Sequence, residues 1–437
     1  MRAGQEKATM KFLFSTFSGV GHVNPFSAIA TELVSRGHEI HWLCGPRFRD
    51  QISATGAHFI PWSSPICDAD VTLGIPDAGT SGMAATVSQA RVLFVDPMVE
   101  QVEDYKRALK KFAADAMVVD MFGFGPMTFA ELGSPEYVTM SLNPRILFDH
   151  PNLPAGQDEG VAMCDAWGSP AFMKEFRPLI DKTRARLGLD PLPSTFGFLD
   201  AMTSPYLHLM QTTPAFELID KAQLPQLRSV GPMRPMTALD FVPPNWWADI
   251  VSRERFVVHV TQGTYTAEST NSETLVQPTL RALKHEDCLV VATTFAVDTK
   301  AFSADSLPAN VRVERFIPHT DLLPFVNVMI TNAGFNGVLA ALSHGVPLIC
   351  AGISEDKGDV SALLAQSGAG ISLNTGSPTE AQICNAVRTI RHDLKYAQQA
   401  KRIQADFAGH DSAVESCDLI ENLVERKRSL SEQCSRS

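Results

Sequence analysis

The stretch that decides the fold runs from residue 11 to residue 40 and reads KFLFSTFSGVGHVNPFSAIATELVSRGHEI. A short apolar run leads into a glycine-rich loop, and the loop leads into a segment with apolar residues at helical spacing. Asn24 and Pro25 suit the start of this helix, and Gly37 suits its end. A second apolar run, EIHWLC, follows directly. The pattern predicts a strand, a helix and a parallel strand, the repeating unit of an open α/β sheet.

The same alternation continues along the chain in two blocks. The first block contains HFIPW, AMVVD and YVTMS, and the second contains RFVVHV, CLVVATTF, VRVERF, NVMITNAG and PLICAG. A proline-rich stretch separates them, and 437 residues are too many for one core. We therefore predict an N-terminal Rossmann-like domain at residues 1–225, an interdomain linker at 226–245 and a C-terminal Rossmann-like domain at 246–437. Ligands of such sheets bind beyond the carboxyl ends of the strands, so the two domains should face each other across a cleft.

Composition excludes several classes of partner. The formal net charge of -11 leaves no basic surplus for a nucleic acid or an acidic membrane. The eight cysteines show no metal-ligand spacing and fit small buried side chains in a reducing compartment. No apolar run approaches the roughly 20 residues of a membrane span, and no signal peptide precedes the first strand. We expect a cytoplasmic monomer or homodimer without an integral membrane segment.

The loop GVGHVNP places a histidine, His22, at the start of the first helix. It fails the dinucleotide fingerprint GxGxxG, because Asn24 stands where the third glycine is required. The positive end of a helix favours neutral imidazole, which can accept a proton. Asp120 ends the run AMVVD and should lie at the same edge of the sheet, where it could hold the other ring nitrogen. The alternative is that His22 and Asp120 only cap local turns.

Three loops of the second block could contribute to a ligand site at the carboxyl ends of the strands. VMITNAGFNG forms a strand, a glycine-bearing turn and a helix start, which suits a phosphate. Tight packing of the helix on the strand would explain these glycines equally well. The loop TQGT offers Gly263 and Thr264 to the same edge. The loop GISEDK offers Asp356 and Lys357 to sugar hydroxyls, or is an ordinary solvated loop.

Together these motifs resemble the family 1 glycosyltransferases of the GT-B fold, the UDP-glycosyltransferase superfamily, and especially its bacterial and fungal macrolide and natural-product members. The resemblance runs from GVGHVNP to the final helices, which it implies pack back on the N-terminal domain. It implies that His22 is the catalytic base, that Asp120 assists it, and that Phe316 stacks on the nucleotide base. The donor-binding residues that it implies are Gly21, Gly263, Thr264, Phe316, His319, Asn332, Gly334, Asn336, Gly337, Asp356 and Lys357.

Three positions depart from the family pattern. Asn332 replaces a histidine at the diphosphate, Ala340 replaces a glutamate at the ribose, and Lys357 replaces a glutamine at the sugar. The expected reaction is an inverting transfer from a UDP-sugar, with UDP-glucose favoured, to a hydroxyl of a small hydrophobic natural product. The alternatives are a nucleotide-sugar-binding protein without transfer activity and a GT-B enzyme that hydrolyses or epimerises a nucleotide sugar.

The acceptor and metal assignments follow from the same interpretation. Phe122, Phe124, Met127 and Phe148 are expected to line the acceptor pocket, together with the segment from Ile66 to Phe94, although each could be ordinary core. Asp68 and Asp70 form a DxD pattern far in sequence from the donor motifs, and we interpret them as an exposed loop pair. The prediction is therefore an enzyme that needs no metal and no cofactor beyond its UDP-sugar cosubstrate.

Overall fold

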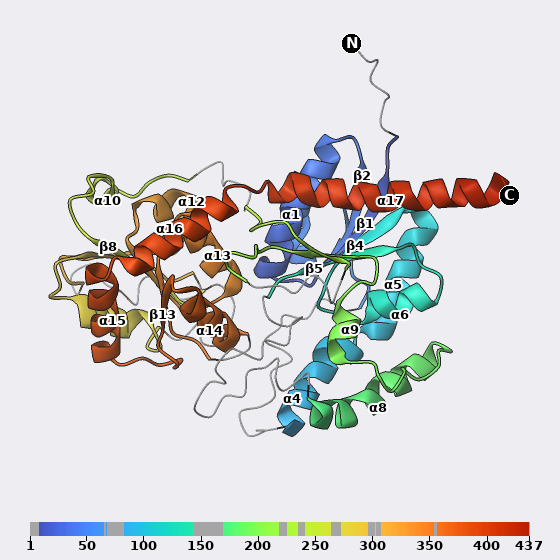
Figure 1. Ribbon diagram of the computed structural model, residues 1–437, viewed down its shortest axis with the longest axis horizontal. Coiled ribbons are helices and arrows are strands. Elements are labelled where there is room, and N and C mark those ends of the chain that lie inside the picture. The colour runs from blue at the N-terminus through green and yellow to red at the C-terminus, as the bar shows by residue number, and fades with distance from the viewer. Residues whose placement is uncertain are drawn as a thin grey trace, which may run out of the picture.

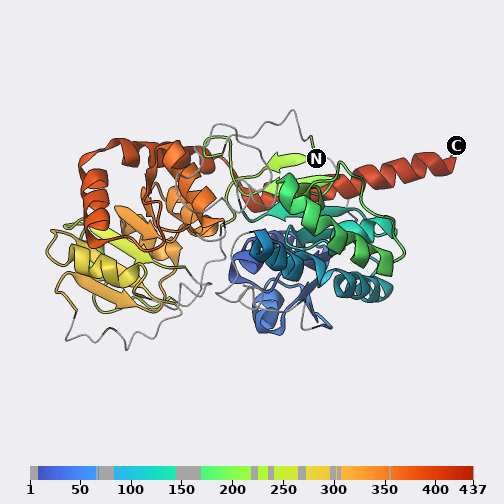
Figure 2. The same ribbon diagram turned by 90° about the horizontal axis from the view of Figure 1, so that it is seen from below.

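The computed structural model describes residues 8–64, 67, 83–143, 169–217, 225–234, 241–263, 272–295, 302, 307–353 and 356–436. They form two parallel sheets, each covered by helices (Figures 1 and 2). The predicted α/β architecture with two Rossmann-like domains is confirmed.

The first sheet has seven parallel strands in the order β3-β2-β1-β4-β5-β6-β7. Alternation within β1 directs Phe12 and Phe14 to one core and Leu13 to the core on the opposite face. Both faces are therefore apolar and need helices over them. The strands are β1 (Lys11–Ser15), β2 (Glu39–Cys44), β3 (His58–Pro61), β4 (Ala116–Asp120), β5 (Tyr137–Ser141), β6 (Leu207–Met210) and β7 (Leu227–Ser229). The helices are α1 (Val20–Ser35), α2 (Arg49–Ala54), α4 (Met83–Ala90), α5 (Met98–Lys111), α6 (Gly125–Glu131), α8 (Pro170–Arg186) and α9 (Phe198–Met202).

The second sheet has six parallel strands in the order β10-β9-β8-β11-β12-β13. Its strands are β8 (Val257–Thr261), β9 (Leu289–Thr293), β10 (Val311–Glu314), β11 (Val328–Thr331), β12 (Leu348–Cys350) and β13 (Gly370–Ser372). Its helices are α10 (Ala248–Val251), α11 (Val276–Leu283), α12 (His319–Leu322), α13 (Phe335–Ser343), α14 (Lys357–Ser367), α15 (Glu380–His392) and α16 (Lys395–Phe407). As in the first domain, loops at the carboxyl ends of the strands lead into the helices.

The predicted start of the linker is wrong. Residues Leu227–Ser229 form β7, the edge strand of the first sheet, so the N-terminal domain extends beyond residue 225. A strand of three residues between prolines carries too little periodicity to be recognised in the sequence. Before β7, the chain already touches the second domain, because Phe216 packs in its core and contacts the ring of Phe407.

Glu217, next to Phe216, is completely buried. None of the described residues gives a hydrogen bond to either of its carboxylate oxygens. Burial raises the pKa of Glu217 to about 8. The contact between the domains therefore contains a carboxyl group that is held mainly in its neutral form at pH 7.

The last helix, α17 (Ser412–Arg436), leaves the second domain and lies along the first, as Figure 1 shows. Its residues Cys417, Ile420 and Val424 belong to the same core as Phe12 and Phe14. No helix among the described residues is both long enough and apolar enough to span a membrane.

Polar contacts fix the position of α17 on the first domain. Arg36 at the end of α1 contacts Asp418 at 2.6 Å and Glu421 at 3.1 Å. The Nδ1 atom of His38 accepts from the backbone N–H of Met10, so its Nε2–H donates to Glu421 at 2.7 Å. The chain thus crosses between the domains a second time and is anchored there by buried hydrogen bonds.

Candidate active site

The strand edge of the first domain brings a histidine and an aspartate together. His22 lies in the first turn of α1, and Asp120 is the last residue of β4, the strand that pairs with β1. Nδ1 of His22 lies 3.0 Å from Oδ2 of Asp120. The carboxylate is buried, with 1% of its side chain exposed, whereas the imidazole keeps 16% of its surface exposed. The spatial pairing expected from the sequence is therefore present, and its catalytic role stays a prediction.

Backbone groups hold Asp120 as a carboxylate acceptor. The N–H of Phe17 donates to Oδ2 at 2.7 Å, and the N–H of Phe122 donates to Oδ1. Because a carboxylate oxygen can only accept, the Nδ1–H of His22 donates a hydrogen bond to Oδ2 of Asp120. The other ring nitrogen, Nε2, then has a free lone pair. A histidine held in this tautomer can accept a proton from a ligand hydroxyl.

Two aromatic rings and one glycine fix the plane of the imidazole. The ring centroids of Phe17 and Phe122 lie 5.3 and 5.1 Å from that of His22. Gly19, the residue before α1, lies against the Cδ2 atom of the imidazole. A Cβ atom added at Gly19 would lie only 2.8 Å from Cδ2 of His22. Glycine is needed at position 19 because any side chain would push the imidazole out of place.

The start of α1 differs from the prediction that Asn24 caps the helix. The helix begins at Val20, and Asn24 lies inside it, where its Oδ1 accepts from Nε2 of Gln51 at 2.8 Å. Pro25 is also internal. Proline has no N–H, so it cannot donate to the carbonyl of Gly21 four residues earlier.

That carbonyl is instead reached from the second domain. Nδ2 of Asn336, in the first turn of α13, donates to the carbonyl oxygen of Gly21 at 2.9 Å. Oδ1 of the same amide accepts from Nε2 of Gln211, which directly follows β6, at 2.9 Å. Asn336 therefore joins the helix start that carries His22 to the helix start predicted to bind the donor.

The loop between β11 and α13 combines tight packing with backbone strain. Asn332 is buried, with 8% exposure, and Ala333 has a φ of 68°, a left-handed conformation that an alanine rarely adopts. Gly334 precedes the helix, and the N–H groups of the first turn, including that of Gly337, have no partner within the helix. A strained turn ahead of free N–H groups is an arrangement suited to an anion.

Neighbouring loops crowd around Asn332. Gly263 follows β8 with a φ of 77°, and a Cβ atom there would lie 3.1 Å from Oδ1 of Asn332. Gly352 follows β12, and its Cβ would clash with the backbone carbonyl of Asn332 at 2.1 Å. Asp356 and Lys357 stand at the start of α14, where only 4% of Lys357 is exposed. Thr264, which was predicted to join this group, lies outside the described residues.

The two residues predicted to contact the nucleotide base, Phe316 and His319, lie just before α12 and at its first position. Phe316 is 56% exposed, and its ring centroid lies 6.2 Å from that of Phe295 in a T-shaped arrangement. An exposed ring of this kind has a free face for stacking. His319 begins α12, and its burial lowers its pKa to about 4, helped by the nearby His344. His319 is therefore neutral at pH 7 and can both donate and accept a hydrogen bond.

The aromatic residues predicted for the acceptor pocket are separated by the structure. Phe122 touches the rings of both His22 and Phe94. Phe124 was wrongly placed in the pocket, because it has no exposed surface and packs within an aromatic core. Met127 belongs to the same core and retains 8% exposure. Phe148, Asp68, Asp70 and most of the segment from Ile66 to Met83 lie outside the described residues.

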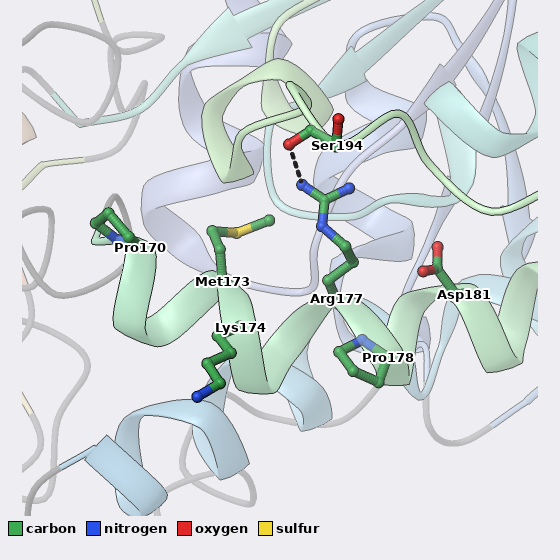
Figure 3. A pocket seen from close by; sticks show the side chains of 7 residues that line it. All are labelled: Pro170, Met173, Lys174, Arg177, Pro178, Asp181 and Ser194. Atoms are coloured by element: carbon green, nitrogen blue, oxygen red, sulfur yellow. Dashed lines mark hydrogen bonds between the residues drawn. The ribbon is translucent and has the colours of Figure 1, made fainter.

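An open hollow of about 590 Å³ lies along α8, away from these groups. Its lining residues are Pro170, Met173, Lys174, Arg177, Pro178, Asp181 and Ser194 (Figure 3). Arg177 extends from α8 toward Ser194 and donates to its backbone carbonyl at 3.3 Å, as Figure 3 shows. Its guanidinium also donates to the backbone carbonyls of Pro193 and Phe196. The hollow shares no residue with the predicted catalytic or donor-binding groups, so it is not part of this site.

Sequence reasoning missed Gly19, Gln211 and Ala333. Gly19 was visible in GVGHVNP, but its contact with the imidazole depends on the ring orientation. Gln211 directly follows β6, and Asp120 is the last residue of β4, so a polar residue at the carboxyl end of a strand was the available signal. The left-handed backbone of Ala333 has no signal in an alanine.

Comparison with known proteins identifies the family of this chain. Residues 277–423 match the family "Erythromycin biosynthesis protein CIII-like, C-terminal domain". The chain is 36% identical over 431 residues to 4'-demethylrebeccamycin synthase from Lentzea aerocolonigenes, covering 95% of this chain and 99% of that protein. It is 29% identical over 413 residues to UDP-glucosyltransferase A1 from Starmerella bombicola, covering 90% and 88% of the two chains. The crystal structure of CalG4, the calicheamicin glycosyltransferase, superposes with a TM-score of 0.73 at 20% identity and covers 96% of this chain and 99% of that one. The chain therefore belongs to the family 1 GT-B glycosyltransferases of the natural-product type.

Proposed function

We propose that this glycosyltransferase moves a hexose, with glucose favoured, from a UDP-sugar to a hydroxyl of a small hydrophobic natural product, with inversion at the anomeric carbon. The observation that carries the proposal is the His22–Asp120 pair. Nδ1 of His22 lies 3.0 Å from Oδ2 of Asp120, and Nε2 of the same ring keeps its lone pair. The relatives named as a UDP-glucosyltransferase and as a synthase of a demethylated rebeccamycin support a sugar donor and a small-molecule acceptor.

In the proposed reaction, His22 is the general base. Nε2 takes the proton of the acceptor hydroxyl as its oxygen attacks the anomeric carbon from the face opposite the nucleotide. The bond between that carbon and the diphosphate oxygen breaks, and UDP leaves with the electron pair. Asp120 keeps the imidazole in the productive tautomer and stabilises the imidazolium that forms.

In the proposed reaction, the leaving diphosphate gains negative charge and lies beside the first turn of α13. Its free backbone N–H groups and the positive end of the helix would stabilise the diphosphate, with the amide of Asn332 beside them. Phe316 would stack on uracil, and His319, Asp356 and Lys357 would contact the nucleotide and sugar. Because neutral donors and a helix terminus supply this stabilisation, the proposed reaction requires no metal.

A donor and acceptor screen tests this proposal. UDP-glucose, other UDP-sugars and dTDP-sugars would each be incubated with phenolic, macrolide, steroid and lipid acceptors, and the products would be weighed by mass spectrometry. We expect a product one hexosyl residue heavier from UDP-glucose, a β-linkage by NMR, and undiminished turnover in EDTA. Hydrolysis of the donor without any glycosylated acceptor would contradict transfer, and loss of turnover in EDTA that added metal restores would contradict metal independence.

A further inference from the structure

Two histidines and a glutamate gather on the outer strands of the first sheet. Glu39 and His41 stand two residues apart on β2 and so share one face. His58 on β3 is the direct register partner of His41. The ligand atoms of the three side chains all lie within 4.8 Å of one another. We propose that Glu39, His41 and His58 form a binding site for a divalent transition-metal ion, with Zn²⁺ as the best fit.

The distances fit a tetrahedral ion after small side-chain rotations. Nε2 of His41 lies 3.4 Å from Oε1 of Glu39, and the centroids of the two imidazoles are 4.9 Å apart. Bonds of about 2.0–2.2 Å in tetrahedral geometry separate neighbouring ligand atoms by roughly 3.4 Å. The His41–Glu39 pair already has this spacing, and His58 is exposed and free to turn. A water would complete the coordination.

The surroundings hold the site in place. Strands position ligands more rigidly than loops do, and the ring of His41 stacks flat on Phe112, at 3.7 Å between centroids and 4° between planes. β3 is the edge strand of the sheet, so an ion reaches His58 from solvent. Two imidazoles and one carboxylate favour Zn²⁺, Ni²⁺ or Cu²⁺ over Mg²⁺ and Ca²⁺, which prefer oxygen ligands alone.

One neighbouring cation opposes the ion. Nζ of Lys11 lies 3.6 Å from Oε2 of Glu39, on the carboxylate oxygen that His41 does not face. Both side chains of this pair are substantially exposed, at 46% and 39%, so the pair is weak and easily exchanged. Lys11 also has an alternative partner, because its ammonium lies 5.5 Å from the ring centroid of Phe112. Removing the charge of Lys11 should therefore strengthen metal binding.

This site is separate from the transfer reaction. Glu39 and His58 are the first residues of their strands, whereas Asp120 is the last residue of β4 in the same parallel sheet. The ion would join the edge strand β3 to β2 and stabilise the folded domain, because it binds only when both strands are paired. It would take no part in donor or acceptor chemistry.

The test is a titration of the tag-free, metal-stripped protein with ZnCl₂ by isothermal calorimetry. We expect one ion per chain with a Kd on the order of 10 µM, and a Zn²⁺-dependent rise in Tm. His58→Asn should weaken binding at least ~10-fold by removing one of three ligands, and Lys11→Met should tighten it by roughly 2- to 5-fold. His392→Asn, at an exposed histidine of the second domain, is the matched control and should leave the Kd unchanged.

Each outcome of the titration either supports or overturns the proposed metal site. Saturable binding that His58→Asn weakens and Lys11→Met strengthens supports the site. Absence of saturable binding at 1 mM (~100-fold above the expected Kd) overturns it, as does binding that responds equally to His58→Asn and His392→Asn. Circular dichroism of the exposed-site variants verifies that they fold. Because transfer activity is not the readout, the outcome is independent of the proposed function.

Discussion

The starts of α1 and α13 are built alike and present different chemistry. Each follows a buried parallel strand and a loop that contains glycine, and each points its first turn at the other domain. The first turn of α1 delivers an ionisable side chain, His22, that a neighbouring strand holds through Asp120. The first turn of α13 offers backbone N–H groups and the amide of Asn336. Under the proposed function, the same local fold supplies a base where a carboxylate lies beside the helix start, and an anion site where neutral groups surround it.

The sharpest way to separate the two helix starts is His22→Ala. Transfer should fall by at least ~100-fold, the lower end of the loss expected for a general base. Donor affinity, measured by calorimetry with UDP, should stay within about twofold because α13 is unchanged. Asp120→Asn should lower kcat as well, since it disturbs the tautomer. Transfer that persists undiminished in His22→Ala would show that another group is the base.

A second prediction concerns Glu217, in the chain that touches both domains. Its pKa in the folded protein is about 8, above the 4.5 of an ordinary glutamate, so the folded protein must keep a proton that the unfolded chain releases. The contribution of Glu217 to stability is therefore largest below pH 4.5 and declines as the pH rises toward 8. Glu217→Gln should raise the free energy of unfolding by about 4 kcal/mol at pH 8 and by about 2 kcal/mol at pH 6.

Urea unfolding at both pH values measures this difference. The informative quantity is the gap between wild type and variant, since other groups titrate in both. A gap that does not widen between pH 6 and pH 8 would mean that Glu217 is already ionised in the folded protein.

The third prediction tests whether sugar transfer depends on the position of the His22 imidazole. Gly19→Ala introduces a Cβ atom 2.8 Å from the imidazole of His22, so the ring must move away from its present plane. Transfer should drop about 10-fold, with little change in donor KM. Gly197→Ala is the matched control, because its added Cβ meets Asp200 at an ordinary 3.5 Å. Equal activity in the two variants would exclude a positioning role for Gly19.

Asn336→Ala probes the link between the two helix starts. It removes the donor to Gly21 and the acceptor for Gln211, both at 2.9 Å. A lost hydrogen bond of this kind corresponds to about 1 kcal/mol, so kcat/KM should fall roughly fivefold. Gln211→Ala should have a smaller effect in the same direction, because it leaves the bond to Gly21 intact. Unchanged kinetics in Asn336→Ala would mean that other contacts hold the two domains in their relative positions.

The smallest expected effect lies in the strained turn before α13. Ala333→Gly relieves the penalty of a left-handed alanine, and the gain is partly offset by the greater freedom of glycine in the unfolded chain. The free energy of unfolding should rise by about 0.5 kcal/mol, measured by chemical denaturation. A loss of stability would show that the methyl group of Ala333 contributes more by packing than its backbone costs.

Much of this molecule was predictable because strands and helices have different hydrophobic periods. The runs around β1, β4, β8 and β11 identified both parallel sheets, and the shared sheet edge placed His22 beside Asp120. The predictions that the structure corrects also have physical explanations. Phe124 has the same residue type and spacing in a core as in a pocket, so only packing distinguishes them. Asn24 is a good capping residue in isolation, but the chain uses it to bind Gln51.

Contacts between distant segments were beyond local reasoning. The bridge from Gln211 through Asn336 to Gly21 depends on how the two domains meet. The cluster of Glu39, His41 and His58 depends on strand register, and its residues carry no metal-ligand spacing along the chain. Such features arise only after the sheets have formed.

Pro25 leaves open a hydrogen-bonding position through which the two halves of this enzyme are joined. Because proline has no N–H, the carbonyl of Gly21 lacks its usual donor within α1. The amide of Asn336, from the other half of the chain, donates to this carbonyl instead. A hybrid that joins this N-terminal half to a C-terminal half without an amide at position 336 would leave a carbonyl unpaired at the domain junction. Exchange of halves between such enzymes, a direct route to new donor and acceptor combinations, should therefore carry positions 25 and 336 together.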